Sequence, residues 1–539
     1  MSTFAEVFTR FGVIASSSKL QSSWSIALLA LVTATGYYVL AQQSRKRARQ
    51  GLPLPPGPKG VPIFGNLFQI PKIEPWLTYK DWSKEYGEVT YLEAMGQPII
   101  ILNSLSAILE LLENRSVNTS TRFPVPAFEI MDIDWIFGVM DYGPDWRAHR
   151  KLFHQLLNSN EVPNYRPVIE QETNKFLRKL SLNPDGFLEE TKELFASLIM
   201  RVSYGVDDDV YNKEIIQDAE VVLQGFSEAA LPGSFMVNVF PIMRYIPSWF
   251  PGAAWKKRLV DVVEVSKRVR TKPWNNAKAR ANKGLSNDEY PNMVKRLIED
   301  LPDEDDPEYR EREIIAQNSI GTAYVAGSDT TVSTGHALFL MLAMYPEVLR
   351  RAQQEIDTVV GAYRLPTASD IDKLVYLKAL IKELTRLHSV APLGFKNSKE
   401  DDVYNGYFIP KGSIFIPNSW SVMHDPEMFE DPMTFKPERY LPSEKWGGKI
   451  NPNIIDPDVA AFGYGRRKCP GRFLSNEAVT FMAAGLIAAF DITPSVDKQG
   501  NKIPLKLEVC SDLVCAPLPF KCDVRPRSER HAALLAMQL

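Results

Sequence analysis

One cysteine lies apart from the others in a segment that suits a metal ligand. Residues 462–472 read FGYGRRKCPGR, and Cys469 is followed by Pro470, a residue favoured in the first turn of a helix. The mostly apolar stretch after it, GRFLSNEAVTFMAAGLIAAF, predicts that helix. Its positive end would lower the pKa of the thiol, and the flanking glycines would let backbone amides point at the sulfur. Thiolate ligation to a metal is one interpretation; a buried packing cysteine and a Cys–His nucleophile are the alternatives.

Charged residues form two further patterns at helical spacing. In KELTR, Glu383 and Arg386 are three residues apart and share one helical face, and FKPERY further along supplies a second guanidinium, Arg439. Taken alone, such a pair is typical of an exposed ion pair, worth less than about 1 kcal/mol. In DWRAHRK, Trp146 and Arg150 are four residues apart, as in an exposed Trp–Arg stack.

A long helical run contains an acid next to a hydroxyl. Within AGSDTT, residues 326–331, Asp329 precedes Thr330, and such a pair can pass protons to a reacting group. Gly321 and Gly327 lie inside the same run, where each costs a helix about 1 kcal/mol relative to alanine. Close packing against another helix is the alternative reason for these glycines.

The cysteine segment resembles the haem-binding loop of the cytochrome P-450 family, with agreement at all positions from 462 to 471. The resemblance implies haem b as the cofactor and Cys469 as the thiolate ligand of its iron. It further implies that Arg467 contacts a haem propionate and that Phe462 lies on the sulfur's side of the ring. A thiolate ligand favours cleavage of the O–O bond, which fits oxygen chemistry.

The charged patterns match the same family, in the family's order along residues 146–472. By this resemblance Trp146 and Arg150 clamp a haem propionate. The resemblance also implies a buried structural triad that holds the cysteine loop, made of Glu383, Arg386 and Arg439. Removal of one member of such a triad would leave an uncompensated buried charge.

In the same family, the helical run forms an oxygen-binding bend. Ala326 and Gly327 would leave room for dioxygen, while Asp329 and Thr330 would relay protons. A family member that only isomerises or dehydrates peroxides would not need that pair. The intact pair therefore favours a monooxygenase over an isomerase or a dehydratase.

Composition indicates one large domain with ordinary globular character. Of 539 residues, 45% are hydrophobic and 24% are charged, and no Gly/Ser linker or internal repeat divides the chain. The net charge of −3 gives no reason to expect nucleic-acid binding. The four cysteines form no CxxC pair, so neither a zinc site nor a disulfide framework is indicated, and a reducing compartment fits.

The N-terminus predicts a membrane anchor. Residues 24–40, WSIALLALVTATGYYVL, carry no charge and are just long enough to cross a bilayer, and four basic residues follow at 45–49. This charge bias predicts an uncleaved, single-pass anchor in the endoplasmic reticulum membrane with a cytoplasmic catalytic domain, so that the sequons at Asn114 and Asn118 stay unmodified. The predicted parts are a lumenal segment 1–23, a transmembrane anchor 24–41, a basic and proline-rich hinge 42–62, a haem-thiolate domain 63–525 and a C-terminal tail 526–539.

Elements that position these residues follow from periodicity. Short β-like runs occupy 89–103, helical patterns dominate 105–390, an irregular region with the strand SIFIP covers 389–460, and an apolar helix spans 472–490. The predicted fold class is mainly α with a minor β region, the cytochrome P-450 fold, as a single large haem domain after an N-terminal transmembrane helix.

The sequence and its resemblance together predict a monooxygenase that inserts one oxygen atom of dioxygen into a lipophilic small molecule. No flavin or nicotinamide module is recognisable, so the electrons would come from NADPH through a separate flavoprotein, NADPH-cytochrome P-450 reductase. A basic docking face for it, or simply solvated charge, is formed by Arg147, Lys151, Arg466, Lys468 and Arg472. A haem-binding sensor or carrier without turnover is the alternative from another class. A purely structural membrane protein would not explain Cys469 and its glycines.

The substrate is predicted from apolar segments that, by the resemblance, face it. The candidate lining residues are Phe123, Trp135, Phe137, Tyr324, Leu393 and Phe395. The texture resembles fungal enzymes of secondary-metabolite biosynthesis, which makes a terpenoid the first expectation and an aromatic or indolic amine the second. Asp132 and Asp134 could meet such an amine, although loop carboxylates are usually solvated.

Overall fold

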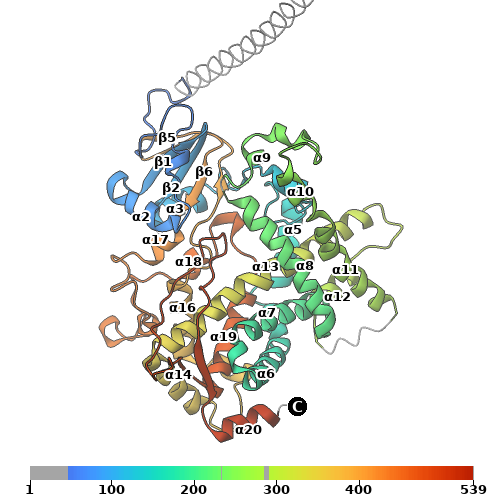
Figure 1. Ribbon diagram of the computed structural model, residues 1–539, viewed down its shortest axis with the longest axis vertical. Coiled ribbons are helices and arrows are strands. Elements are labelled where there is room, and N and C mark those ends of the chain that lie inside the picture. The colour runs from blue at the N-terminus through green and yellow to red at the C-terminus, as the bar shows by residue number, and fades with distance from the viewer. Residues whose placement is uncertain (1–46, 232, 284–289, 538–539) are drawn as a thin grey trace, which may run out of the picture.

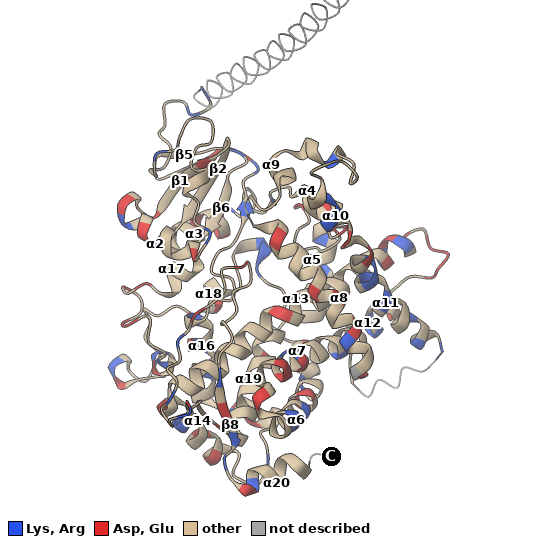
Figure 2. Ribbon diagram, viewed as in Figure 1, with Lys and Arg blue, Asp and Glu red and all other residues tan. Residues whose placement is uncertain are grey.

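A large helical body and a smaller β-containing part make up the chain (Figure 1). The structure is a computed structural model that describes residues 47–231, 233–283 and 290–537. Lys and Arg are mixed with Asp and Glu over the outer helices, with neither sign dominating (Figure 2). The mainly α fold class with a minor β region is confirmed.

The β part is a four-stranded sheet in the order β1-β2-β6-β3. Strands β1 (Val89–Ala94) and β2 (Gln97–Leu102) form an antiparallel hairpin, as the runs in 89–103 predicted, and β6 (Ile414–Pro417) lies parallel to β2. The Ile-rich strand β2 is buried along nearly its whole length, because β-branched side chains pack well on a pleated surface covered on both faces. The remaining strands are β3 (Lys396–Asn397), β4 (Asp402–Tyr404), β5 (Tyr407–Ile409), β7 (Phe490–Pro494) and β8 (Cys522–Pro526).

Helices form the rest of the body. They are α2 (Pro75–Tyr86), α3 (Leu105–Ile108), α4 (Pro126–Ile130), α5 (Pro144–Leu157), α6 (Arg166–Leu182), α7 (Phe187–Tyr204), α8 (Asp209–Ala230), α9 (Met236–Val239), α10 (Ala254–Val260), α11 (Val263–Asn282), α12 (Met293–Glu299), α13 (Tyr309–Met344), α14 (Pro346–Val359), α15 (Ala368–Ile371), α16 (Val375–Leu387), α17 (Ser419–Met423), α18 (Asp458–Ala461), α19 (Arg472–Ala489) and α20 (Glu529–Met537). The apolar helix predicted at 472–490 is confirmed as α19.

Helix α13 runs through the middle of the body, where α5, α7, α16 and α19 pack on it (Figure 1). Its buried residues lie all round its axis, as expected of a core helix. Two of its glycines permit close approach to α7. A Cβ at Gly327 would lie 3.0 Å from Cγ1 of Ile199, and one at Gly335 would lie 2.7 Å from Cγ2 of Thr191. Close helix packing is therefore a sufficient reason for Gly327.

The predicted membrane anchor, 24–41, lies outside the described residues. Within the described ranges no single helix is both long and apolar enough to cross a membrane, and only α13 and α14 taken together, bent by 103°, meet that test of length and composition. At the other end, the segment predicted as a tail contains α20, which packs on α6 and buries Leu535.

Candidate haem-thiolate site

The cysteine loop is shaped by a close approach between two chain segments. Gly465 has φ +60°, and a Cβ there would lie 2.2 Å from the carbonyl oxygen of Leu112, so no larger residue fits. The loop then closes on itself, because the Cys469 amide donates a 2.8 Å hydrogen bond to the carbonyl oxygen of Phe462. Helix α19 begins three residues later, at Arg472. Cys469 is thus held at the N-terminal end of α19, where the sequence placed it.

The environment of the Cys469 thiol combines opposing effects. Burial raises its pKa, while the backbone amides of Gly471 and Arg472 and the guanidinium groups of Arg150 and Arg472 lower it. The net direction is upward, against the lowering expected from the helix terminus alone. The reason is that desolvation of the thiolate outweighs the helix end until a cation, such as a bound metal, lies next to the sulfur.

Arg467 projects from this loop into the interior. Its Nε donates to the carbonyl oxygen of Ser120 and its Nη2 to that of Met140, both at 2.8 Å, and its guanidinium lies 4.7 Å from the ring centroid of Trp146. The third nitrogen, Nη1, and the buried Nε1 of Trp146 have no hydrogen-bond partner among the described residues. The structure therefore brings Arg467 and Trp146 together with two donors unused.

Two more cations lie beside Arg467, and neither stood out in the sequence. Arg122 donates to the carbonyl oxygens of Gly138 and Phe395, and Lys396, 6% exposed, donates to that of Tyr464. Only long-range packing brings them here, because Arg122 precedes α4 while Lys396 belongs to β3. We call Arg122, Lys396 and Arg467 the cation cluster.

The members of the cation cluster have lowered pKa values, because they are buried without a carboxylate partner among the described residues. Burial lowers the pKa of Arg467 to about 9, that of Arg122 to about 10 and that of Lys396 to about 7. The charge of Arg122 lowers the pKa of Arg467 further, and the charges of Arg122 and Arg467 do the same for Lys396. The opposing charges of Asp141 and Glu113 offset only part of this. No member forms an ion pair with any carboxylate in the described part of the chain.

These features fit haem b. Its propionates are carboxylates that would accept from the unused Nη1 of Arg467 and Nε1 of Trp146 and supply the missing negative charge. Arg150, whose pKa burial lowers and Cys469 raises, lies close enough to the sulfur to feel its charge. Thiolate, cations and donors therefore form one donor set suited to this cofactor.

The charged triad of Glu383, Arg386 and Arg439 is assembled and buried. Arg386 donates from Nε and Nη2 to the two carboxylate oxygens of Glu383 at 2.7 and 2.8 Å, and both residues are 0% exposed. Arg439 adds a 3.3 Å contact from its Nε to Glu383. The remaining donors of Arg386 bind carbonyl oxygens of residues 423, 432 and 434. An exposed i,i+3 pair is thereby excluded, and the triad ties α16 to the segment that precedes the cysteine loop.

The acid and the hydroxyl of α13 lie on an open face of that helix. Ala326 and Asp329 are exposed and Thr330 is half-buried, whereas residues 320–325 are buried. Thr330 Oγ1 donates a 2.9 Å hydrogen bond to the carbonyl oxygen of Ala326, as hydroxyl residues in helices often do. Helix α13 is also joined to α19, the helix that follows Cys469, because the hydroxyl groups of Thr331 and Ser475 share a 3.2 Å hydrogen bond.

Charges from two other helices surround Asp329. Although the Asp329 side chain is solvent-accessible, the helices around it remove part of its hydration and raise its pKa, which Lys192 of α7 lowers and Glu220 of α8 raises again. Lys192 and Glu220 themselves form an ion pair of 2.6 Å. The charges of this Lys192–Glu220 ion pair therefore act directly on the pKa of Asp329.

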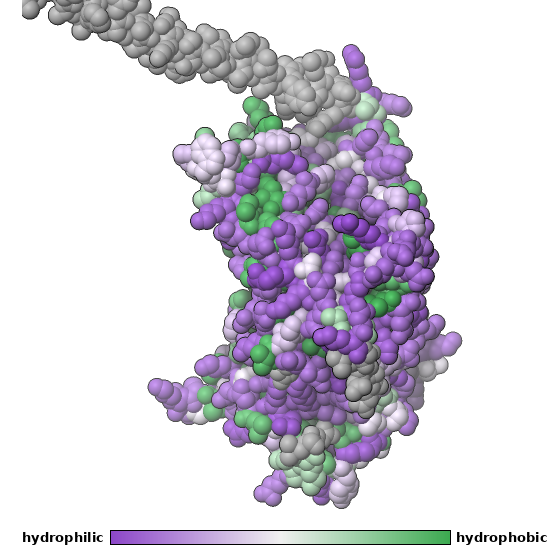
Figure 3. Space-filling view, turned by 90° about the vertical axis from the view of Figure 1, so that its right-hand side faces the viewer, coloured by the Kyte–Doolittle hydropathy of each residue, from purple (hydrophilic) through white to green (hydrophobic). Residues whose placement is uncertain are grey.

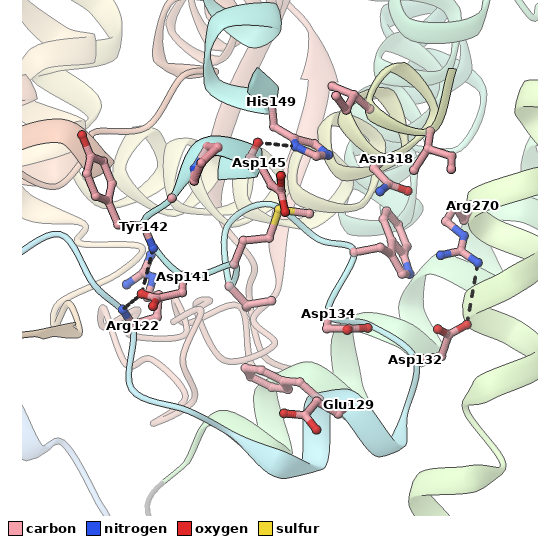
Figure 4. A pocket seen from close by; sticks show the side chains of 18 of the residues that line it. Arg122, Glu129, Asp132, Asp134, Asp141, Tyr142, Asp145, His149, Arg270 and Asn318 are labelled. Carbon is pink, nitrogen blue, oxygen red and sulfur yellow. Dashed lines mark hydrogen bonds and ion pairs between the residues drawn. The ribbon is translucent and has the colours of Figure 1, made fainter. Parts of the chain in front are cut away.

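A cavity of about 1190 Å³ opens beside this site (Figure 4). Its walls come from residues 122–145, from α5 and α11, and from the start of α13. Of the apolar residues predicted to face substrate, Phe123 and Trp135 line this cavity, and so do Asp132 and Asp134. We call it the 122–145 cleft.

The other four predicted lining residues lie elsewhere. The Phe137 ring packs against α5, and the fully buried Tyr324 meets the end of α7 edge-on. Leu393 and Phe395 pack against the core of the four-stranded sheet. Of the segments predicted to face substrate, one therefore lines this cleft, and the roles of the six residues stay predictions.

Comparisons with known proteins identify the family. Residues 55–524 match the family described as Cytochrome P-450. The chain is 48% identical over 515 residues to the cytochrome P-450 monooxygenase COX1 of Coprinopsis cinerea, covering 95% of this chain and 98% of that protein. It is 40% identical to COX2 of the same fungus, covering 91% and 92% of the two chains, and 34% identical to the tryptamine 4-monooxygenase of Psilocybe cyanescens, covering 94% and 98%.

The chain therefore belongs to the cytochrome P-450 family. It is an oxidoreductase of the monooxygenase class, and the family implies haem iron as the cofactor.

Proposed function

We propose that this monooxygenase oxidises a lipophilic small molecule of fungal secondary metabolism at the membrane, with electrons from NADPH delivered by a separate flavoprotein reductase. The observation that carries the proposal is the pairing of Cys469 at the start of α19 with the open acid–hydroxyl face of α13. A carrier or sensor would need the thiolate but not the proton-relay face.

The residues of the site would have three roles: binding the haem propionates, ligating the iron and holding protons. Arg467, Trp146, Arg122 and Lys396 would hold the propionates, and Cys469 would ligate the iron from the α19 side. Bound haem supplies the activation of dioxygen. The protein's own contribution on the other side is to hold protons at Asp329 and at Thr330 Oγ1, with the hydroxyl oriented by the Ala326 carbonyl.

Two residues of the predicted reductase-docking face lie close together over one aromatic ring. Arg147 and Arg466 both lie over the ring of Tyr142, at 5.9 and 5.5 Å from its centroid. Together with the exposed Lys151 they present positive charge next to the loop that carries Cys469. A carboxylate-rich partner surface would be attracted there, and mutation of these residues should change the association rate and its salt dependence.

Membrane attachment is proposed from the 24–41 anchor together with exposed apolar side chains on the body. Between α9 and α10, four large apolar residues are each more than half exposed, namely Ile242, Tyr245, Trp249 and Phe250. Phe68 and Ile73, near the N-terminal end of the described chain, are 75% and 78% exposed. Figure 3 shows hydrophobic side chains on the upper part of one face of the molecule, among others lower down, and exposed apolar patches mark membrane or protein contacts. We place the body against the cytoplasmic side of the endoplasmic reticulum membrane.

For the substrate, a terpenoid remains the first proposal, on the basis of the apolar lining and the resemblance to fungal secondary-metabolite enzymes. An aromatic amine is a second candidate favoured by two observations. Carboxylates line the 122–145 cleft, and one relative carries the name tryptamine 4-monooxygenase.

The test is to reconstitute the purified haem protein with a reductase and NADPH and to offer a sesquiterpene, a sterol, a fatty acid and an aromatic amine. We expect one class to shift the haem spectrum from low to high spin and to be hydroxylated. Absence of NADPH-driven oxygen consumption with every class would favour the carrier alternative, whereas NADPH oxidation without product would reject this substrate panel and keep the enzyme class.

A further inference from the structure

The 122–145 cleft is distinct in its lining from the haem-binding loop. None of residues 462–472 lines it, nor do Ala326, Asp329 and Thr330. Its lining includes Arg122 of the cation cluster and Arg310 at the start of α13. Molecules on their way to the haem could therefore be recognised here by groups that take no part in oxygen chemistry.

Two buried hydrogen-bond acceptors at one end of the cleft are unused. His149 of α5 is 3% exposed, and its Nδ1 lies 2.7 Å from the carbonyl oxygen of Asp145. A carbonyl only accepts, so Nδ1 carries the proton. Burial lowers the pKa of His149, so the neutral ring leaves Nε2 as an acceptor, and this atom has no partner among the described residues.

The second acceptor comes from the neighbouring helix. Asn318 of α13 is 7% exposed, and its Oδ1 likewise has no partner in the part of the chain that the structure describes. Both side chains line the cleft and lie close together in it (Figure 4). Buried acceptors without donors are costly, so a ligand that brings N–H or O–H groups would relieve both.

The charge of the cleft selects among donors. Its ionisable lining contains more carboxylates than guanidinium groups, namely Glu129, Asp132, Asp134, Asp141, Asp145 and Glu311 against Arg122, Arg270 and Arg310. The charge of Arg270 is partly neutralised by Asp132, whose Oδ2 lies 3.9 Å from Arg270 Nη2. Burial and the neighbouring carboxylates of Asp132 and Glu129 raise the pKa of Asp134, which shows the crowding of negative charge. A cationic donor fits this field better than a neutral one.

Apolar side chains form the rest of the wall. Phe123, Phe128 and Trp135 come from the 122–145 segment, and Ile314, 47% exposed, comes from α13. A ligand that satisfied the acceptors would at the same time bury its own apolar body against these rings.

We propose that the 122–145 cleft binds a protonated amine on an apolar body, with the ammonium group donating to His149 Nε2 and Asn318 Oδ1. This deepens the second substrate candidate of the proposed function, the amine, and it rests on that function only in naming the occupant as a substrate on its way to the haem. The binding itself needs no turnover.

Binding is tested on the holoenzyme with three probes that share one body: 4-phenylbutylamine, 4-phenylbutan-1-ol and butylbenzene. Calorimetry at pH 7 and low salt should show the amine binding about tenfold or more tightly than the alcohol, and the alcohol more tightly than butylbenzene. The haem spectrum is recorded in the same titration, because an amine that only ligates the iron would shift it with the same midpoint.

Variants decide where the amine binds. His149→Phe with Asn318→Leu should weaken the amine about tenfold or more and leave butylbenzene unchanged, whereas His154→Phe, an exposed position on the same helix, should change neither. If the double variant does not fold, Asp134→Asn, at an exposed position, should still weaken the amine in low salt. Equal affinities for the three probes, or amine binding that follows only the iron spectrum, would overturn the proposal.

Turnover separates this inference from the proposed function. Amine binding that depends on both acceptors, with oxidation of another class but not of any amine, would overturn the naming of the amine as substrate. Failure of every class to be oxidised would instead reject the proposed function, while the calorimetric result would still decide the binding proposal.

Discussion

The protein contains two buried groups of cations, the triad and the cation cluster, and they differ in how their charges and hydrogen-bond donors are satisfied. In the triad, every guanidinium nitrogen of Arg386 has an acceptor, and Glu383 supplies the opposite charge. In the cation cluster, Arg467 Nη1 has no partner and no member is paired with a carboxylate among the residues that the structure describes. One group is complete within the chain, while the other is complete only with an anion from outside.

The contrast separates stability from binding. A satisfied buried ion set is costly to break but adds little when formed, because desolvation cancels most of the attraction. An unsatisfied set raises the free energy of the empty protein and returns it when an anion binds. We infer that the triad holds the cysteine loop in place and that the unpaired cation cluster strengthens binding of the haem propionates.

The largest expected effect comes from breaking the triad at its only carboxylate. Glu383→Gln would strand two buried guanidinium groups and should lower the free energy of unfolding by about 3–5 kcal/mol, measured by chemical denaturation. Asp81→Asn is the matched control, since Asp81 and Lys84 form an i,i+3 pair of 2.7 Å that is 69% and 73% exposed. That change should cost less than about 1 kcal/mol. Equal losses in the two variants would contradict a buried triad.

The cation cluster should respond in the opposite way. Arg467→Met removes a buried charge, so the apoprotein should be no less stable, while the dissociation constant for haem should rise about tenfold to a hundredfold through loss of a charged hydrogen bond. Haem transfer to a scavenging protein measures this. Arg268→Met, at an exposed residue paired with Asp218, should leave haem affinity unchanged. A destabilised apoprotein with normal haem affinity would show that Arg467 is structural.

Within the triad, the two arginines should differ. Arg439→Met leaves Glu383 and Arg386 as a neutral, doubly hydrogen-bonded pair, so it should cost less than half of the loss in Glu383→Gln. Denaturation of the two variants in parallel gives the ratio. A loss as large as that of Glu383→Gln would mean that Arg439, through its bond to the Asp431 carbonyl, carries the segment by itself.

The smallest effect is a pH dependence of haem binding. Lys396 has a pKa of about 7 in the empty protein, and a bound propionate would raise it, so binding takes up a proton. Haem affinity should therefore be full below pH 7 and fall as the pH rises above 7, by less than about tenfold per pH unit. Lys396→Met should flatten this profile. A profile unchanged by the substitution would remove Lys396 from the cluster.

The sequence located those parts of the site that are local. The cysteine loop, the start of α19, strands β1 and β2, and the i,i+3 spacing of Glu383 and Arg386 all follow from residues near one another in the chain. Glycine, proline and apolar periodicity report on such short-range structure directly.

What the sequence did not locate depends on contacts between distant segments. Arg122 and Lys396 are single cations among 62, and only the packing of the segment before α4 against β3 and the cysteine loop removes them from water. Asn318 and His149 likewise become notable only because α13 and α5 bury them at one cleft.

The central claim is that Cys469 is the thiolate ligand of a haem held by the cation cluster. Its most direct test is the absorbance of the ferrous carbon monoxide complex in the wild type and in Cys469→His. We expect the wild type to show the red-shifted Soret band of a thiolate ligand, and the variant to retain haem with a band at the shorter wavelength of an imidazole ligand. Folded wild type without the thiolate band, or the same band in both proteins, would contradict the account.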